Sequence, residues 1–217
     1  MLADNGAFPY PAAVPDALYR SLVWLDVRLG VLFAVAIPLV LLGWATLRRE
    51  TALLRLLGLY WKVASLLLIA LLLLIDRRPL GFLLLVLAPL LIVAVLWFWV
   101  DLNEELADLP PWRPLPLTVR IWRWSLTFLS LLTAAFASTA LACMGGVARL
   151  PLCPVWLEAP LGLNGVVARV FTFVFGGQWT PGVAAFVGYA ALTGYVVGVV
   201  QWLLVRLPRQ GRIAGEF

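Results

Sequence analysis

The chain has 217 residues, of which 64% are hydrophobic and only 12% charged, a composition outside the soluble globular range that predicts a membrane protein. It contains no histidine, which excludes imidazole bases, histidine-ligated haem and the usual zinc sites. The net charge of +5 comes from cations near the ends of apolar runs, so we expect these cations to meet lipid headgroups and not nucleic acid.

Five apolar runs, each about 20 residues long, are long enough to cross a bilayer as α-helices. The predicted spans are residues 29–47, 56–75, 80–100, 124–143 and 183–205. We therefore expect an all-α fold in which residues 1–217 form a single membrane domain.

Residues 1–16 predict a short coil without the basic region of a cleaved signal peptide, so we expect the first span to direct insertion. Leucines at helical spacing from residue 18 to residue 29 then predict a partly interfacial helix that runs into this span. The prolines at positions 38 and 89 predict kinks. The second span is almost all leucine from Leu66 to Leu74, and we expect this face to contact lipid.

The connections after the third and fourth spans differ in character. An acidic helical extension from Asp101 is followed by a proline cluster at residues 110–116, which predicts an extended linker. Residues 144–182 form the longest connection, and its apolar stretch at 166–175 is too short to cross a bilayer. We expect an interfacial or re-entrant helix there and not a sixth span.

The positive-inside rule predicts the orientation of the chain. One side holds nine cations, concentrated in the shorter connections: Arg48, Arg49, Arg55, Arg113, Arg120, Arg123, Arg206, Arg209 and Arg212. The other side holds six: Arg20, Arg28, Arg77, Arg78, Arg149 and Arg169. We therefore expect a cytoplasmic C-terminus and an external N-terminus.

Cys143 and Cys153 are the only cysteines, and the predicted orientation places both on the external, oxidising side. One interpretation is a disulfide that stabilises the longest connection. The other is two unpaired small apolar side chains.

Small residues at every fourth position mark the faces through which membrane helices pack. The fourth and fifth spans carry such faces, made of Ser130, Ala134, Ser138 and Ala142 in the fourth and of Ala190, Gly194 and Gly198 in the fifth. We expect these faces to be contact surfaces, either between the two spans or with a partner protein.

Two charged stripes are predicted at the cytoplasmic surface. Four carboxylates at helical spacing follow the third span, namely Asp101, Glu104, Glu105 and Asp108, and three cations seven residues apart enter the second, namely Arg48, Arg55 and Lys62. Mutual pairing is one interpretation, because a desolvated charge is costly unless it is paired.

Two functional alternatives use the same charges. The four carboxylates from Asp101 to Asp108 could hold magnesium, as in lipid or prenyl enzymes, although those enzymes use two acidic segments and this chain has one. Lys62, together with Asp26 and Arg28, could instead serve a small transporter or ion carrier. Neither alternative comes with a nucleophile and base pair.

Several segments resemble one family: residues 20–29 (RSLVWLDVRL), 60–65 (YWKVAS), 96–105 (LWFWVDLNEE), 122–124 (WRW), 153–158 (CPVWLE) and 205–212 (VRLPRQGR). It is an uncharacterised integral-membrane family of cyanobacteria and plastids, the domain of unknown function 3177. The resemblance implies a plasma or thylakoid membrane and brings no catalytic residues or cofactor. We expect a non-catalytic protein that binds lipids or membrane proteins and helps assemble a photosynthetic or bioenergetic complex.

Overall fold

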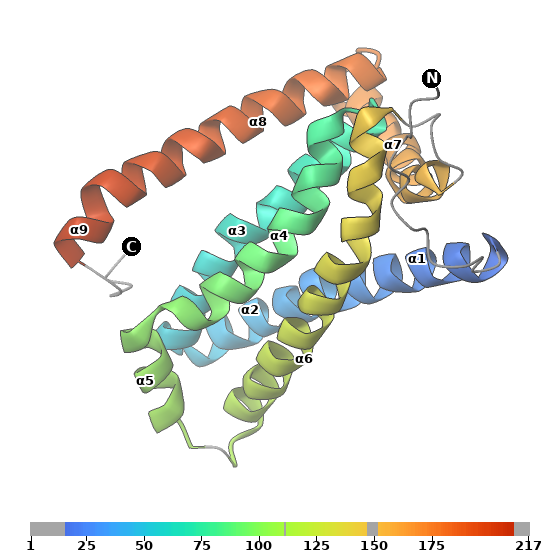
Figure 1. Cartoon of the computed structure of the whole chain (residues 1–217). Coiled ribbons are helices and arrows are strands. Elements are labelled where there is room, and N and C mark those ends of the chain that lie inside the picture. The colour runs from blue at the N-terminus through green and yellow to red at the C-terminus, as the bar shows by residue number, and fades with distance from the viewer. Residues whose placement is uncertain (1–15, 111, 147–151, 211–217) are drawn as a thin grey trace, which may run out of the picture.

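The computed structural model describes residues 16–110, 112–146 and 152–210. The expected coil at residues 1–15, together with Arg149 and Arg212, lies outside these ranges. Every regular element in the described ranges is a helix, which confirms the all-α prediction (Figure 1). Six of the helices are long enough and apolar enough to cross a membrane.

The first three elements form one continuous helix from Ala17 to Arg48. They are α1 (Asp16–Gly30), the π-helix η1 (Val31–Ala36) and α2 (Ile37–Arg48). As predicted, the N-terminal segment runs into the first span without a break. The helix ends at Arg48, and the next residue, Arg49, adopts the left-handed backbone conformation that commonly terminates helices.

The centre of the molecule is the hairpin of α3 (Thr51–Ile75) and α4 (Pro79–Phe98). Its turn is tight because Gly81 lies directly against Leu74, where an added Cβ would be only 2.8 Å from the Leu74 Cγ. Helix α3 is buried on the face that includes Leu66, Leu73 and Leu74, so the expectation of a lipid-facing second span is wrong. Leucine does not distinguish the two environments, because lipid is as apolar as a protein core.

Helix α4 ends at Phe98, and the extended backbone of Trp99 separates it from α5 (Val100–Asp108). The acidic extension is therefore a separate helix. Helix α6 (Pro114–Ala137) continues as the 3₁₀ helix η2 (Ser138–Gly145) and begins ten residues before the predicted span. The predicted extended linker is thus wrong from Pro114 onward, since the first turn of a helix tolerates proline.

The long connection contains α7 (Cys153–Phe175), so a loop with only a short apolar helix is not what the structure has. Pro154 lies in the first turn of α7, where a helix tolerates proline. Trp156 and Leu157 are buried against other elements, and these tertiary contacts stabilise a helix longer than the apolar stretch alone predicts. Cys143 and Cys153 form a disulfide that ties α7 to η2. The chain then continues through α8 (Pro181–Gln201), the π-helix η4 (Trp202–Arg206) and α9 (Leu207–Gln210).

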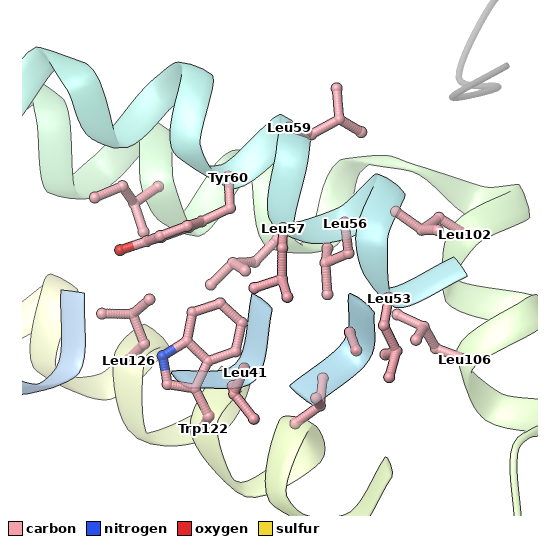
Figure 2. Packing of buried hydrophobic residues seen from close by; sticks show 14 of the residues in the cluster. Leu41, Leu53, Leu56, Leu57, Leu59, Tyr60, Leu102, Leu106, Trp122 and Leu126 are labelled. Carbon is pink, nitrogen blue, oxygen red and sulfur yellow. The ribbon is translucent and has the colours of Figure 1, made fainter. Parts of the chain in front are cut away.

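Helix α6 packs on α4, α8 packs on α3, and the long N-terminal helix crosses α3 and α6 (Figure 1). The largest buried cluster lies where α2, α3, α5 and α6 converge. Its side chains include Leu41, Leu53, Leu57, Tyr60 and Trp122 (Figure 2).

Side chains donate hydrogen bonds to backbone carbonyls of η1. These carbonyls need other donors because Pro38 has no N–H to donate to the preceding turn. The Trp122 indole donates a hydrogen bond of 2.9 Å to the Phe33 carbonyl, and the Tyr60 hydroxyl donates one of 2.5 Å to the Ala34 carbonyl. Both carbonyls lie four or five residues before Pro38, where an α- or π-helix would otherwise require its N–H. The irregular helix is thereby joined to α3 and α6.

We expect Trp122→Phe to lower the free energy of unfolding by about 1–3 kcal/mol, because it removes the donor to a buried carbonyl. The measurement is unfolding by denaturing detergent in mixed micelles. Trp124→Phe is the matched control, since that indole is 62% exposed. Equal stabilities of the two variants would contradict this role of Trp122.

Candidate functional site

A polar network holds the break between α4 and α5. Arg123 of α6 donates hydrogen bonds of 2.5 Å from Nη2 to the Leu96 carbonyl and to Asn103 Oδ1. Asn103 in turn donates from Nδ2 to the Trp97 carbonyl over 3.1 Å. Two carbonyls of the last α4 turn, which lack helical partners, are satisfied in this way.

The Arg123 side chain is buried, with only 7% of its surface exposed, and its guanidinium carbon lies 4.3 Å from the centre of the Trp97 ring. A cation at the C-terminus of α4 also interacts favourably with the helix dipole. The Arg123 Nε is buried and has no hydrogen-bond partner among the described residues. Arg123 therefore brings a positive charge into the protein that neutral acceptors and an aromatic face partly compensate.

From the sequence, Arg123 is expected only as a cation outside the membrane, because the predicted fourth span begins at residue 124. The sequence feature that could have indicated its buried position is an arginine between two tryptophans, Trp122 and Trp124. The structure shows that this segment belongs to a helix that begins at Pro114. Asn103 and Tyr60 were also missed as structural residues, because nothing in their neighbourhood indicates which carbonyl they would meet.

A second feature is the groove between α8 and the α3–α4 hairpin. Helix α8 approaches α3 near its start, where an added Cβ on Gly188 would be 2.9 Å from Leu73 Cδ2. It approaches α4 again at η4, where Trp202 contacts the rings of Phe98 and Trp99 at centroid distances of 6.1 and 5.7 Å. Between these two contacts Leu192 and Tyr195 pack against the hairpin core, while Gly194 and Gly198 border an open groove.

The groove has a volume of about 630 Å³ and a mostly apolar lining. Gly194 and Gly198 of α8 face a wall that includes Val63, Leu91 and Val95. No atom lies within 4 Å of a Cβ added to either glycine, so this small-residue face is not occupied by another helix of the described chain. Lys62 is the only charged residue among the described residues that line the groove.

The two predicted charged stripes meet where Arg55 forms an ion pair with Glu105. Glu104 and Asp108 are exposed on α5, and Arg48 is exposed at the end of α2. In the described ranges, no three acidic, cysteine or histidine residues are placed to hold a metal ion. The structure therefore offers the magnesium alternative no ligand cluster.

Asp26 lies in a different cavity from Lys62. Thr133 of α6 donates a hydrogen bond of 2.5 Å to Asp26 Oδ1, beside a cavity of about 180 Å³ between α1, α3, α4, α6 and α7. Arg28 is exposed and does not line this cavity. Lys62, Asp26 and Arg28, on which the transporter alternative depends, therefore do not line one cavity.

A family model described as protein of unknown function (DUF3177) matches residues 20–215. The chain belongs to this family. No curated protein and no solved structure matches the chain.

Two of the segments that carry the family resemblance form the polar network described above. Residues 96–105 contain the α4–α5 break and Asn103, and residues 122–124 contain the side chains that satisfy η1 and the end of α4. In this member of the family, residues 96–105 and 122–124 thus help to hold the helices together.

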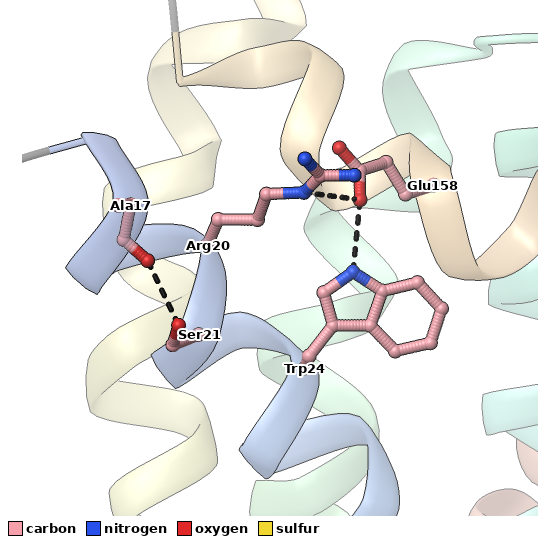
Figure 3. A network of polar contacts seen from close by, with 5 residues as sticks. All are labelled: Ala17, Arg20, Ser21, Trp24 and Glu158. Carbon is pink, nitrogen blue, oxygen red and sulfur yellow. Dashed lines mark hydrogen bonds and ion pairs between the residues drawn. The ribbon is translucent and has the colours of Figure 1, made fainter.

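Two further segments meet at the opposite end of the bundle (Figure 3). Glu158 of α7 accepts hydrogen bonds from Arg20 Nε at 3.0 Å and from Trp24 Nε1 at 2.8 Å. The Trp156 indole donates to the Tyr19 hydroxyl over 2.8 Å. With the disulfide, these contacts fasten α7 to α1 and η2.

The small-residue faces of the fourth and fifth spans do not pack together in the described structure. Ser130 and Ala134 are buried, and α6 packs on α4, whereas Ser138 and Ala142 are exposed. The face of α8 instead borders the groove.

We expect Asn103→Ala to lower the free energy of unfolding by about 2 kcal/mol, because the change removes the acceptor of a buried cation and the donor to the Trp97 carbonyl. The adjacent variant Glu104→Ala, at an exposed site of the same helix, controls for helix propensity. Unfolding in mixed micelles compares the two. A loss no larger than that of Glu104→Ala would show that the network does not stabilise the break.

Proposed function

We propose that this integral membrane protein is non-catalytic and acts by binding, with the groove between α8 and the α3–α4 hairpin as the site for the hydrophobic chain of a lipid-like amphiphile. The observation that carries the proposal is the groove itself, about 630 Å³ in volume and open along the two glycines. Ligand sites are commonly concave, mostly apolar and of this size.

The dimensions of the groove favour a hydrocarbon chain over an α-helix as its occupant. Along α8 and η4 the groove runs from Gly194 to Leu203, nine residues or about 14 Å. A helix about 10 Å wide over that length would occupy roughly 1,100 Å³, more than the groove provides. One leaflet contributes about 15 Å to the hydrocarbon core, so a single acyl or isoprenoid chain fits.

Polar groups in the groove suit the head of an amphiphile. Lys62 lines it together with Ser65 and Tyr195. The Trp99 indole also lines it, and its buried Nε1 has no hydrogen-bond partner in the described ranges. A few polar groups in an apolar site fix the orientation of a ligand.

We further propose five membrane crossings, with α7 remaining on the external side. The first turns of α7 pack near Leu74 and Phe82, at the turn of the α3–α4 hairpin. Helix α8 begins at the same end of the hairpin, since Gly188 lies against Leu73. Only five residues separate the end of α7 at Phe175 from the start of α8 at Pro181. Five residues reach at most about 18 Å, which is too short to return from a 23-residue helix that crossed.

Five crossings agree with the orientation expected from the arginine distribution, with the C-terminus in the cytoplasm and the N-terminus outside. The disulfide would then lie on the external side, where oxidising conditions allow it. The family resemblance supports placing the protein in a plasma or thylakoid membrane.

A second proposal is that the protein helps assemble a membrane complex. The observation that favours it is the exposure of α7 and α8, of whose apolar windows only 11% and 17% are buried, against 50% for α3. Large apolar side chains such as Phe173 and Phe186 cover their exposed faces. Purification in mild detergent, with identification of co-purifying proteins, tests this second function.

For the groove, we expect Gly198→Leu to abolish binding of parinaric acid, a fluorescent fatty acid, because the new side chain fills the site. The apparent melting temperature should not fall, since no atom lies within 4 Å of the added Cβ. Energy transfer from tryptophan to the polyene reports binding, because Trp99 and Trp202 line the groove.

Gly162→Leu is the matched control, because this α7 glycine is also free of neighbours and lies outside the groove. It should bind parinaric acid like the unaltered protein. The groove would be rejected as the site if both variants bound equally well, or if unlabelled fatty acid did not compete.

For the topology, we expect Gly177→Cys and Arg78→Cys to react with a membrane-impermeant maleimide in intact cells, and Arg48→Cys to remain unlabelled. The natural cysteines do not interfere, since both are in the disulfide. Labelling after permeabilisation checks that each thiol is reactive. A Gly177→Cys variant protected like Arg48→Cys would mean that α7 crosses the membrane.

A further inference from the structure

A separate cavity of about 390 Å³ lies between α5 and the first turns of α6. Trp97 and Trp124 form an aromatic part of its lining, and Asn103, Arg120 and Arg123 supply polar groups. It lies at the end of the bundle opposite the disulfide, beside the junction of α4 and α5.

The charges that border this cavity are positive. Arg123 is buried and belongs to none of the ion pairs Arg20–Glu158, Arg55–Glu105 and Arg78–Asp76. Arg120 lies three residues before Arg123 and also lines the cavity. The α5 carboxylates are absent from the described lining, because α5 turns Asn103, Leu106 and Ala107 toward the cavity.

A buried cation is costly unless an opposite charge meets it. Here neutral carbonyl and amide oxygens accept from Arg123 Nη2, while no hydrogen-bond partner for Nε is found in the part of the chain that the structure describes. Arginine is well suited to phosphate, because its fork of donors matches the phosphate oxygens. Basic pockets between membrane helices bind anionic headgroups in the same way.

We propose that the cavity between α5 and α6 binds a phosphate-type anion through Arg120 and Arg123. Tryptophans are enriched at the depth of lipid headgroups, and the Trp97 and Trp124 rings pack at a centroid distance of 4.9 Å beside the cavity. The phosphate belongs either to a phospholipid headgroup or to a soluble phosphate ester. This site is independent of the groove, which lies on the other side of the hairpin and has its own lining.

The test uses the full-length protein in phosphatidylcholine nanodiscs. One arm adds increasing fractions of phosphatidylglycerol, and another adds sn-glycerol 3-phosphate or inorganic phosphate to the buffer. Tryptophan fluorescence and the apparent melting temperature report binding. The binding should be saturable, and Arg120→Gln should weaken it about fivefold, since one arginine near the surface contributes about 1 kcal/mol.

Arg113→Gln is the matched control, because this exposed residue carries the same charge at the same end of α6 and does not line the cavity. Arg123→Gln should abolish binding, but this variant also loses the cap of α4, so Arg120→Gln decides the test. Saturation by phosphatidylglycerol alone identifies a headgroup, and saturation by the soluble esters identifies a soluble ligand. The proposal is overturned if no binding saturates or if Arg113→Gln and Arg120→Gln weaken it equally.

Discussion

In a membrane, backbone carbonyls must find partners inside the protein, because the hydrocarbon core offers none. Helical hydrogen bonding is interrupted before Pro38 and at Trp99, and adjacent residues of α6 satisfy carbonyls at both places. Trp122 donates to the Phe33 carbonyl and Arg123 to the Leu96 carbonyl. Helix α6 is therefore joined by hydrogen bonds to the N-terminal helix and to α4, and the positions of these helices depend on one another.

The hairpin of α3 and α4 supplies the buried surface on which the other helices lie, but it does not engage them equally. Helix α8 is held at its two ends, at Gly188 by close backbone approach and at Trp202 by aromatic contacts. Leu192 and Tyr195 also pack against the hairpin, so only the face with Gly194 and Gly198 is left to border an apolar groove. The binding proposal thus follows from where α8 is packed and where it is not.

Much of the helical architecture was predictable from hydrophobic runs, because a bilayer imposes a minimum length on each span. The starts of helices were less predictable: the proline cluster at residues 110–116 suggested an extended linker, yet Pro114 occupies a first turn, where its missing N–H costs nothing. The candidate site was predicted in part. Lys62, Gly194 and Gly198 were singled out individually, but nothing in sequence spacing indicates that they border one groove. Arg123 was assigned to the wrong environment, because a span predicted from residue 124 excluded it.

The sequence by itself determined the solvent, the helical class and the family, because these depend on the composition and length of local segments and on recognisable motifs. The tertiary structure decided which faces are buried. Leu66–Leu74 is equally apolar on all sides, and only its neighbours make α3 central instead of lipid-facing. Similarly, Trp122 and Arg123 acquire their roles only when folding brings the carbonyls of residues 33 and 96 within hydrogen-bonding distance. Contacts between residues 27 and 89 positions apart leave no local pattern, so three-dimensional packing alone establishes them.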